Sequence, residues 1–384
     1  MNKTAVRIRA GMAAFRNPSG IRRQGSGGTR NRSGVRRNWS GGMAILLASL
    51  CLSTLPATAA TVSVNCDAGN TIAAALGNVK PGDTVLVNGT CNEQVSFNPE
   101  LVRITLDGQK KTTIQHPGKG AASPHTVFIK GNDIFIKGVT VIGGLDGIHL
   151  SGPASAEIDG AVVMKTARAG VHIDKGSIAR ILNTTVQDSG AMGIDITGAS
   201  YAYIGVRIPR IPALSPVTVR NSGGPGINIE RSSGAWIVGN TISNNKGGGI
   251  EVHRNSHADV MANVIDANAG DAITASFGSG INLRSEPRRD GPNQTAQENG
   301  GVGIRCTTGG FVDGPPGTLN GKQGAKAIEH GCVDRVERSR KNPSGVRRQG
   351  SGVPKPVRGQ ASGGRRVISK LVTAALITAK LVTA

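Results

Sequence analysis

Histidine and carboxylate side chains occupy regularly repeated positions in the middle of the chain. His149, His172 and Asp195 follow one another at intervals of 23 residues. A histidine beside a carboxylate can act as a general base, and two carboxylates can serve as the acid and base of a glycosidase. The candidate catalytic residues are His149, His172, Asp195, Glu230, Glu251 and His253.

These residues lie in, or directly after, repeated four-residue segments with the pattern glycine, aliphatic, polar, aliphatic. The segments are called phrases below. The first aliphatic positions are Ile148, Val171, Ile194, Ile227, Ile250 and Ile273, with gaps of 23, 23, 33, 23 and 23 residues. Two further aliphatic columns follow the same rule, and all three place an insertion of ten residues between Ile204 and Val219. A fixed period of this size is typical of a solenoid.

Each phrase alternates in the manner of a β-strand. Ile148 and Leu150 would face inward and His149 outward, which is strand rather than helix periodicity. Three short strands in each turn cannot bury an apolar face alone, so we expect coils to stack with parallel strands about 4.8 Å apart. The glycine before each phrase predicts a turn with tight or left-handed backbone.

This repeat resembles the right-handed parallel β-helix of the pectin-lyase-like superfamily over about residues 60–334. The resemblance implies an all-β, single-stranded right-handed solenoid that acts outside the cytoplasm among polysaccharides. Its handedness comes from the resemblance, because the period alone does not show it. The sequence lacks the Asn-Thr-Asp, Gly-His-Gly and Arg-Ile-Lys signatures of polygalacturonases and the Asp-Pro-His segment of mannuronan epimerases. The resemblance therefore assigns no catalytic residue, and fold alone is a weak guide to activity.

A short amphipathic helix is predicted at the entrance to the solenoid. Asn70 and Thr71 can cap a helix over 72–79, and Pro81 would end it. Residues 84–87 would then form the beginning of the first strand. The helix would cover the apolar end of the stack, which would otherwise be an exposed edge able to associate with other chains.

The formal charge of +21 is concentrated in two low-complexity segments. Residues 1–42 hold ten Lys and Arg and no acid, whereas residues 335–384 hold twelve against one acid, Glu337. Residues 43–334 then carry 23 basic and 23 acidic residues, so we expect no nucleic acid as a partner of the folded domain. The segments can be interpreted as disordered basic arms. Alternatively, the reading frame runs through repetitive flanking DNA and the true start is Met43.

An apolar stretch followed by small residues begins at Met43. Residues 43–59 have the apolar run and the Ala57-Thr58-Ala59 cleavage pattern of a secretory signal. The run is too short to span a bilayer, and a second apolar segment does not follow it, so no membrane span is expected after cleavage. We therefore predict a secreted or periplasmic domain over residues 60–334, followed by the basic tail.

Four cysteines remain in the predicted mature domain. Cys66 and Cys91 are 25 residues apart, and Cys306 and Cys332 are 26 apart. Both separations are close to one coil, so each pair could bridge adjacent turns at one end of the solenoid. We predict both disulfides, as suits an exported protein. A four-cysteine metal site is the weaker alternative, because no short C-x-x-C spacing is present.

Outward positions of the solenoid are where chemistry could lie. Across coils, His172 would neighbour Asp195, and Glu230 would neighbour both Glu251 and His253. A plain solvated face with modestly stabilising charge ladders is the alternative. A metal site on His149, His172 and Asp195 is possible in ligand type, but strand ladders offer no diagnostic spacing. Calcium is the other cofactor considered, and none is assigned.

A second outward column carries aromatic residues. Tyr203 and Trp236 would lie on adjacent coils with Arg180 alongside, which could make a stacking platform for sugars. Alternatively, the ten-residue insertion folds over the two rings and buries them.

The sequence thus predicts an exported β-helix that binds or processes an acidic or neutral polysaccharide. If it is an enzyme, a histidine would abstract the C5 proton of a uronate in a lyase or epimerase, or two carboxylates would act in a hydrolase. The rival hypothesis is a non-catalytic surface or adhesion solenoid.

Overall fold

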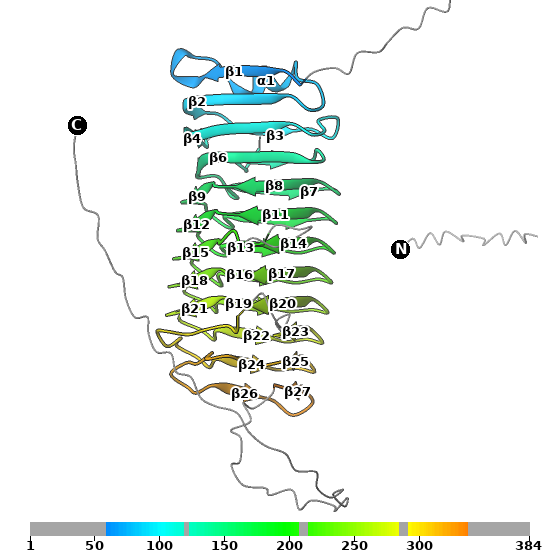
Figure 1. Ribbon diagram of the computed structural model, residues 1–384, viewed down its shortest axis with the longest axis vertical. Coiled ribbons are helices and arrows are strands. Elements are labelled where there is room, and N and C mark those ends of the chain that lie inside the picture. The colour runs from blue at the N-terminus through cyan, green and yellow to red at the C-terminus, as the bar shows by residue number, and fades with distance from the viewer. Residues whose placement is uncertain (1–58, 119–122, 207–213, 284–290, 337–384) are drawn as a thin grey trace, which may run out of the picture. The chain divides into compact units, whose positions relative to one another are not determined.

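The computed structural model describes residues 59–118, 123–206, 214–283 and 291–336. The expected basic segment and signal peptide, most of the C-terminal tail and residues 207–213 of the insertion lie outside these ranges. The described residues form a parallel β-solenoid of about 11 turns with about 23 residues in each (Figure 1). No helix among them is long and apolar enough to cross a membrane.

Two parallel sheets run the length of the stack. The larger sheet has 17 strands: β1 (Thr61–Asn65), β2 (Thr84–Asn92), β4 (Thr105–Gln115), β6 (Ile134–Ile142), β8 (Ser155–Asp159), β9 (Val162–Met164), β11 (Ile178–Leu182), β12 (Thr185–Gln187), β14 (Tyr201–Ile204), β15 (Thr218–Arg220), β17 (Gly234–Val238), β18 (Thr241–Ser243), β20 (His257–Met261), β21 (Val264–Asp266), β23 (Gly280–Asn282), β25 (Phe311–Asp313) and β27 (Val333–Arg335).

The smaller sheet has ten strands, one from each of ten coils. They are β3 (Val95–Phe97), β5 (Val127–Ile129), β7 (Ile148–Ser151), β10 (Val171–Asp174), β13 (Ile194–Ile196), β16 (Ile227–Ile229), β19 (Ile250–Val252), β22 (Ile273–Ala275), β24 (Ile304–Cys306) and β26 (Lys326–Ile328).

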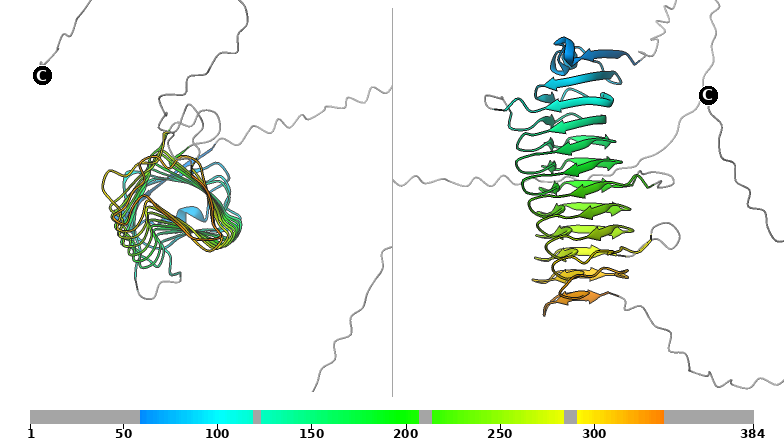
Figure 2. Two further views of the ribbon diagram at one scale, coloured as in Figure 1. Left: turned by 90° about the horizontal axis from the view of Figure 1, so that it is seen from below. Right: turned by 90° about the vertical axis from the view of Figure 1, so that its left-hand side faces the viewer.

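The register between strands reproduces the predicted repeat. Val171 pairs with Ile148 on one side and with Ile194 on the other, and Ile194 pairs with Ile227 across the insertion. All five of the first aliphatic residues from Ile148 to Ile250 are fully buried. The coils superimpose when seen along the stack, as Figure 2 shows. The predicted parallel β-helix, with its aliphatic interior, is therefore confirmed.

The glycine before each repeated phrase has a different role from the one expected. Gly147 and Gly170 do not have positive φ, so no left-handed turn requires them. Instead, a Cβ at Gly147 would lie 2.4 Å from Val163 Cγ1 and 2.8 Å from the carbonyl oxygen of Gly170. The glycine is needed because successive coils and the next strand approach its Cα too closely for any side chain.

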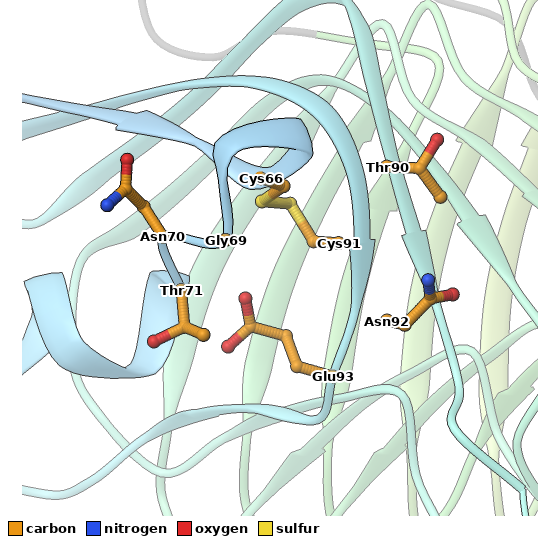
Figure 3. A pocket seen from close by; sticks show the side chains of 8 residues that line it. All are labelled: Cys66, Gly69, Asn70, Thr71, Thr90, Cys91, Asn92 and Glu93. Carbon is orange, nitrogen blue, oxygen red and sulfur yellow. A yellow bond between two sulfur atoms is a disulfide. The ribbon is translucent and has the colours of Figure 1, made fainter.

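The N-terminal end is closed by a helix and a disulfide. Helix α1 covers Ile72–Leu76, shorter than the predicted 72–79, and it lies over the interior of the coils in Figure 2. Its first backbone N–H groups donate to the Glu93 carboxylate at 2.7 and 3.0 Å, and Figure 3 shows that carboxylate pointing toward Thr71. A carboxylate at this position satisfies N–H groups that a helix start leaves unpaired.

Both predicted disulfides are present. Cys66 joins Cys91 with a Cα–Cα distance of 5.0 Å, and Cys306 joins Cys332 with 6.1 Å. Each ties a terminal coil to its neighbour. Strand β1 precedes the helix and was not predicted, because Thr61–Asn65 lies before the first recognisable repeat.

Two ladders of buried asparagines hold successive turns together. In one, the Asn240 side chain donates to Asn263 Oδ1 at 3.0 Å, and Asn263 donates to Asn293 Oδ1 at 3.0 Å. Asn263 Nδ2 also donates to the carbonyl oxygen of Ile237 at 2.9 Å. Each side chain thus supplies partners to turn backbone that would otherwise be buried without any.

We expect Asn263→Ala to destabilise the solenoid by about 3 kcal/mol, because several buried polar groups lose a partner at about 1–3 kcal/mol each. Chemical denaturation followed by circular dichroism measures this loss. Asn88→Ala, at an exposed position of β2, serves as the control and should change the free energy of unfolding by less than about 0.5 kcal/mol. Equal effects of both substitutions would contradict a stabilising role for the ladder.

Candidate active site on the smaller sheet

Four of the six candidate catalytic residues, His149, His172, Asp195 and Glu251, lie in strands of the smaller sheet, and Glu230 and His253 directly follow β16 and β19. The cross-coil register places His149 beside His172, His172 beside Asp195, and Asn228 between Asp195 and Glu251. Strand spacing puts neighbours about 4.8 Å apart. The face divides into two groups with different partners, one around His149 and one around Glu251.

The first group, called the histidine–aspartate cluster below, combines three imidazoles, three carboxylates and one guanidinium. Its members are His125, Asp146, His149, Arg168, His172, Asp174 and Asp195. The three imidazoles follow one another along the stack. Ring centroids are 4.3 Å apart for His125 and His149, and 4.6 Å apart for His149 and His172.

Asp146 anchors one end of this cluster. Its carboxylate is fully buried and accepts hydrogen bonds from Arg168 Nε at 2.8 Å and from Arg168 Nη2 at 2.5 Å. His125 Nδ1 lies 2.9 Å from the same carboxylate, and His125 Nε2 lies 3.0 Å from His149 Nδ1. A carboxylate beside Nδ1 favours the proton there. The line of contacts thus directs the second nitrogen of His149, Nε2, away from Asp146.

Asp195 anchors the other end. Its Oδ2 lies 2.9 Å from His172 Nδ1, and its Oδ1 accepts a hydrogen bond from Asn228 Nδ2 at 2.8 Å. The proton of His172 is therefore favoured at Nδ1, which leaves a lone pair at Nε2. Asp174 stands between the two histidines, 3.3 Å from His149 Nε2 and 3.7 Å from His172 Nε2.

Electrostatics keep the carboxylates of Asp146 and Asp174 charged. Burial alone would raise the pKa of Asp146, but hydrogen bonds from His125 and Arg168 outweigh it and lower this pKa far below its usual range. The same pairing raises the pKa of Arg168. Burial would also raise the pKa of Asp174, yet the Ser151 hydroxyl and the two neighbouring imidazoles lower it.

The same environment keeps His149 neutral. Burial is the main cause, followed by the nearby His172 and His125, and together they lower the pKa of His149 to about 4. His149, His172 and Asp195 are only 7%, 5% and 4% exposed, respectively. The alternative of a plain solvated face therefore does not describe this part of the sheet.

The second group does match a solvated face. Glu230 directly follows β16, and the register places it beside the coil that carries Glu251 and His253, as expected. Its carboxylate pairs with Arg231 at 2.8 Å and with Arg254 at 2.5 Å, both largely exposed. His253 Nε2 lies 3.2 Å from Glu251 Oε2, and His253 Nδ1 lies 2.8 Å from Ser276 Oγ. Arg231 and Arg254, rather than His253, therefore pair with the Glu230 carboxylate.

The candidate catalytic residues chosen from the sequence did not include four members of the first group. These are His125, Asp146, Arg168 and Asp174. Asp146 and Arg168 lie in the turns before the strands, where the repeat does not constrain side-chain direction. The sequence signal that could have found Asp146 is its residue type and position, since this carboxylate directly precedes the first Gly-aliphatic-His phrase. His125 precedes a coil whose pattern is less regular.

The predicted sugar-binding residues lie on the larger sheet, away from this cluster. Tyr203 pairs with Arg180 on β11 and with Trp236 on β17. The guanidinium carbon of Arg180 is 5.9 Å from the Tyr203 ring centroid, and the two aromatic ring centroids are 6.4 Å apart. Both rings pack partly against a small cluster of Val206, Val238 and Met261. They remain a predicted binding platform, on a different face from the histidines.

Two sets of side chains converge closely enough to hold a metal ion in the described part of this face. One is His125, Asp146 and His149, and the other is His149, His172 and Asp174. Calcium takes six to eight oxygen ligands. Neither set fits calcium, because most of the donor atoms are imidazole nitrogens.

A family model described as a right-handed β-helix region matches residues 146–313. The fold is a right-handed parallel β-helix. The pectate lyase Pel9A superimposes with a TM-score of 0.50 at 11% identity, over 71% of this chain and 78% of that one. A search of curated proteins by sequence found no match.

Two further solved structures superimpose with lower TM-scores. The A-module of the mannuronan C-5 epimerase AlgE4 from Azotobacter vinelandii gives a TM-score of 0.46 at 12% identity, over 68% of this chain and 85% of that one. A double mutant of the periplasmic alginate epimerase AlgG gives 0.41 at 16% identity, over 72% and 82%. At these identities, the structural likenesses establish the fold alone.

The stability of the solenoid should fall as the pH drops from about 6.5 to about 4. The folded pKa of His149, about 4, lies below the ordinary 6.5, so the unfolded chain binds the proton more readily in this interval. Complete protonation would cost about 3 kcal/mol. Urea denaturation at pH 7, 5.5 and 4.5 measures the trend, and His149→Gln should flatten it. An equally steep trend in that variant would rule out His149 as its source.

Proposed function

We propose that this chain is an exported polysaccharide-processing protein that removes a proton from a uronate sugar, as a lyase or an epimerase does. The observation that carries this proposal is the placement of His172. Its Nδ1 lies 2.9 Å from the buried carboxylate of Asp195, while its Nε2 has no carboxylate nearer than Asp174 at 3.7 Å among the described residues.

A general base needs a lone pair and a fixed orientation. Asp195 provides the orientation, and it is itself held by the amide of Asn228. The register across β10, β13 and β16 brings these three residues together, so strand pairing rather than a loop positions the base. Sites built on strands in this way are held more rigidly than sites on loops.

Glycoside hydrolysis is less well supported by the same geometry. A hydrolase needs one carboxyl group that stays protonated near neutral pH, which requires a raised pKa. Burial is outweighed at both Asp146 and Asp174, whose pKa values are lowered.

Export is part of the proposal. Two disulfides near the ends of the solenoid suit an oxidising compartment. A signal peptide over residues 43–59 would deliver the domain there. The extended stack suits a long polymer, because the smaller sheet presents one outward strand position in each of ten coils.

A panel of pectic, alginate and other uronate polymers tests the activity. Ultraviolet absorbance of new unsaturated ends reports a lyase, and proton nuclear magnetic resonance of the recovered polymer reports C5 epimerisation. We expect His172→Gln to lower turnover by at least about a hundredfold, and Asp195→Asn by about tenfold or more. The matched control is His257→Gln, which removes a histidine from the larger sheet.

The variants must retain the β-sheet circular dichroism spectrum of the parent chain. Turnover that survives in folded His172→Gln would exclude this histidine as the base. If the parent chain shows no turnover on any polymer, the result would favour the rival hypothesis of a binding or adhesion solenoid.

A further inference from the structure

We propose that His149, His172 and Asp174 form a binding site for a divalent transition-metal ion of the zinc class. The inference uses the same cluster as the proposed function, but it stands on ligand geometry. One ring nitrogen of each histidine and a carboxylate oxygen of Asp174 all lie within 4.8 Å of one another.

The separations suit a shared ion. His149 Nε2 lies 3.3 Å from Asp174 Oδ1, and His172 Nε2 lies 3.7 Å from Asp174 Oδ2. Zinc bonds of about 2.0 Å at tetrahedral angles place neighbouring ligand atoms about 3.3 Å apart. The three side chains therefore need only small rotations to bind one ion.

Two of the ligand atoms lack any other partner. His149 Nε2 and Asp174 Oδ1 are buried and make no hydrogen bond to the described residues. The His149 side chain is only 9% exposed, so water cannot readily satisfy this nitrogen. A buried lone pair without a donor is costly, and a cation between the nitrogen and the carboxylate would remove that cost.

The outer contacts are those that metal-binding histidines require. Such histidines usually donate their second ring N–H to a carboxylate or another acceptor. His172 Nδ1 faces Asp195 at 2.9 Å. His149 Nδ1 reaches His125 at 3.0 Å, and His125 in turn contacts the buried carboxylate of Asp146. Both Nε2 atoms are thereby directed toward Asp174.

The other converging set is less suited to hold the ion. The carboxylate of Asp146 is already engaged by two bonds from Arg168 and one from the backbone N–H of Ala169. The facing nitrogens of His125 and His149 are occupied with each other. Asp146 and His125 therefore orient a ligand instead of serving as ligands.

Chemistry selects the kind of ion. Two imidazoles and one carboxylate suit zinc, cobalt, nickel or copper and do not suit calcium or magnesium. Asp174 is partly exposed, so an ion can enter from its side. Three protein ligands also leave a coordination position for water or a sugar oxygen.

Metal binding and the proposed base role exclude each other. An ion held by Nε2 of His172 takes the lone pair that would accept the substrate proton. Zinc should therefore inhibit turnover at one equivalent, and a chelator should restore it. The metal site would make the enzyme responsive to the zinc level outside the cytoplasm.

The test uses the full chain, exported so that its disulfides form, and then treated with a chelator. Titration with Co²⁺ should give visible absorption bands that saturate at one equivalent and disappear on addition of Zn²⁺. Asp174→Asn and His172→Gln should each weaken Co²⁺ binding at least about tenfold, and Asp195→Asn should weaken it by about tenfold.

The control is His257→Gln, which leaves the cluster intact and should bind Co²⁺ as the parent chain does. Absence of saturable binding in the folded parent chain would overturn the proposal, as would parent-like binding in both ligand variants. If Co²⁺ binds at one equivalent but turnover is unaffected by it, the metal site stands and the assignment of His172 as base fails.

Discussion

The hydrogen-bonded register between successive coils is the constraint on which the rest of this molecule depends. Because each strand pairs with its equivalent one coil away, a residue type repeated in the sequence becomes a column in space. The aliphatic columns form the interior. The outward columns bring side chains that are 23 residues apart to about 4.8 Å, the separation of paired strands. A shift of one residue in a single strand would turn its outward side chain into the interior.

That constraint explains why the repeat predicted the fold so fully. Fully buried residues such as Ile148 and Ile194 were identifiable from spacing alone, and so were the partners of each disulfide. The role of Gly147 was not, because its cause is a close approach by Val163 and the next coil. The spacing shows which residues share a column. Steric conflict depends on distances between atoms, which a repeat length does not determine.

The candidate site shows the same division. His172 beside Asp195 follows directly from the register and could be predicted. Asp146 and Arg168 approach from turns, and the repeat carries no information about where a turn side chain points. The register also places Glu230 beside the coil of Glu251 and His253, but it does not predict that Arg231 and Arg254 pair with its carboxylate. Columns are thus predictable from sequence, while contacts between columns and turns depend on side-chain chemistry and burial.

The buried character of the histidine–aspartate cluster links stability to chemistry. Outward residues of a solenoid are ordinarily solvated, yet His149 and His172 are almost fully enclosed. Burial favours neutral imidazoles, and the flanking carboxylates of Asp146 and Asp195 fix which nitrogen keeps its lone pair. Two lone pairs then face one carboxylate, an arrangement that stabilises the chain only when a proton or a cation lies between them. The proposed base and the proposed metal site share the same nitrogen of His172, so under these two proposals an ion bound there would exclude proton transfer through it.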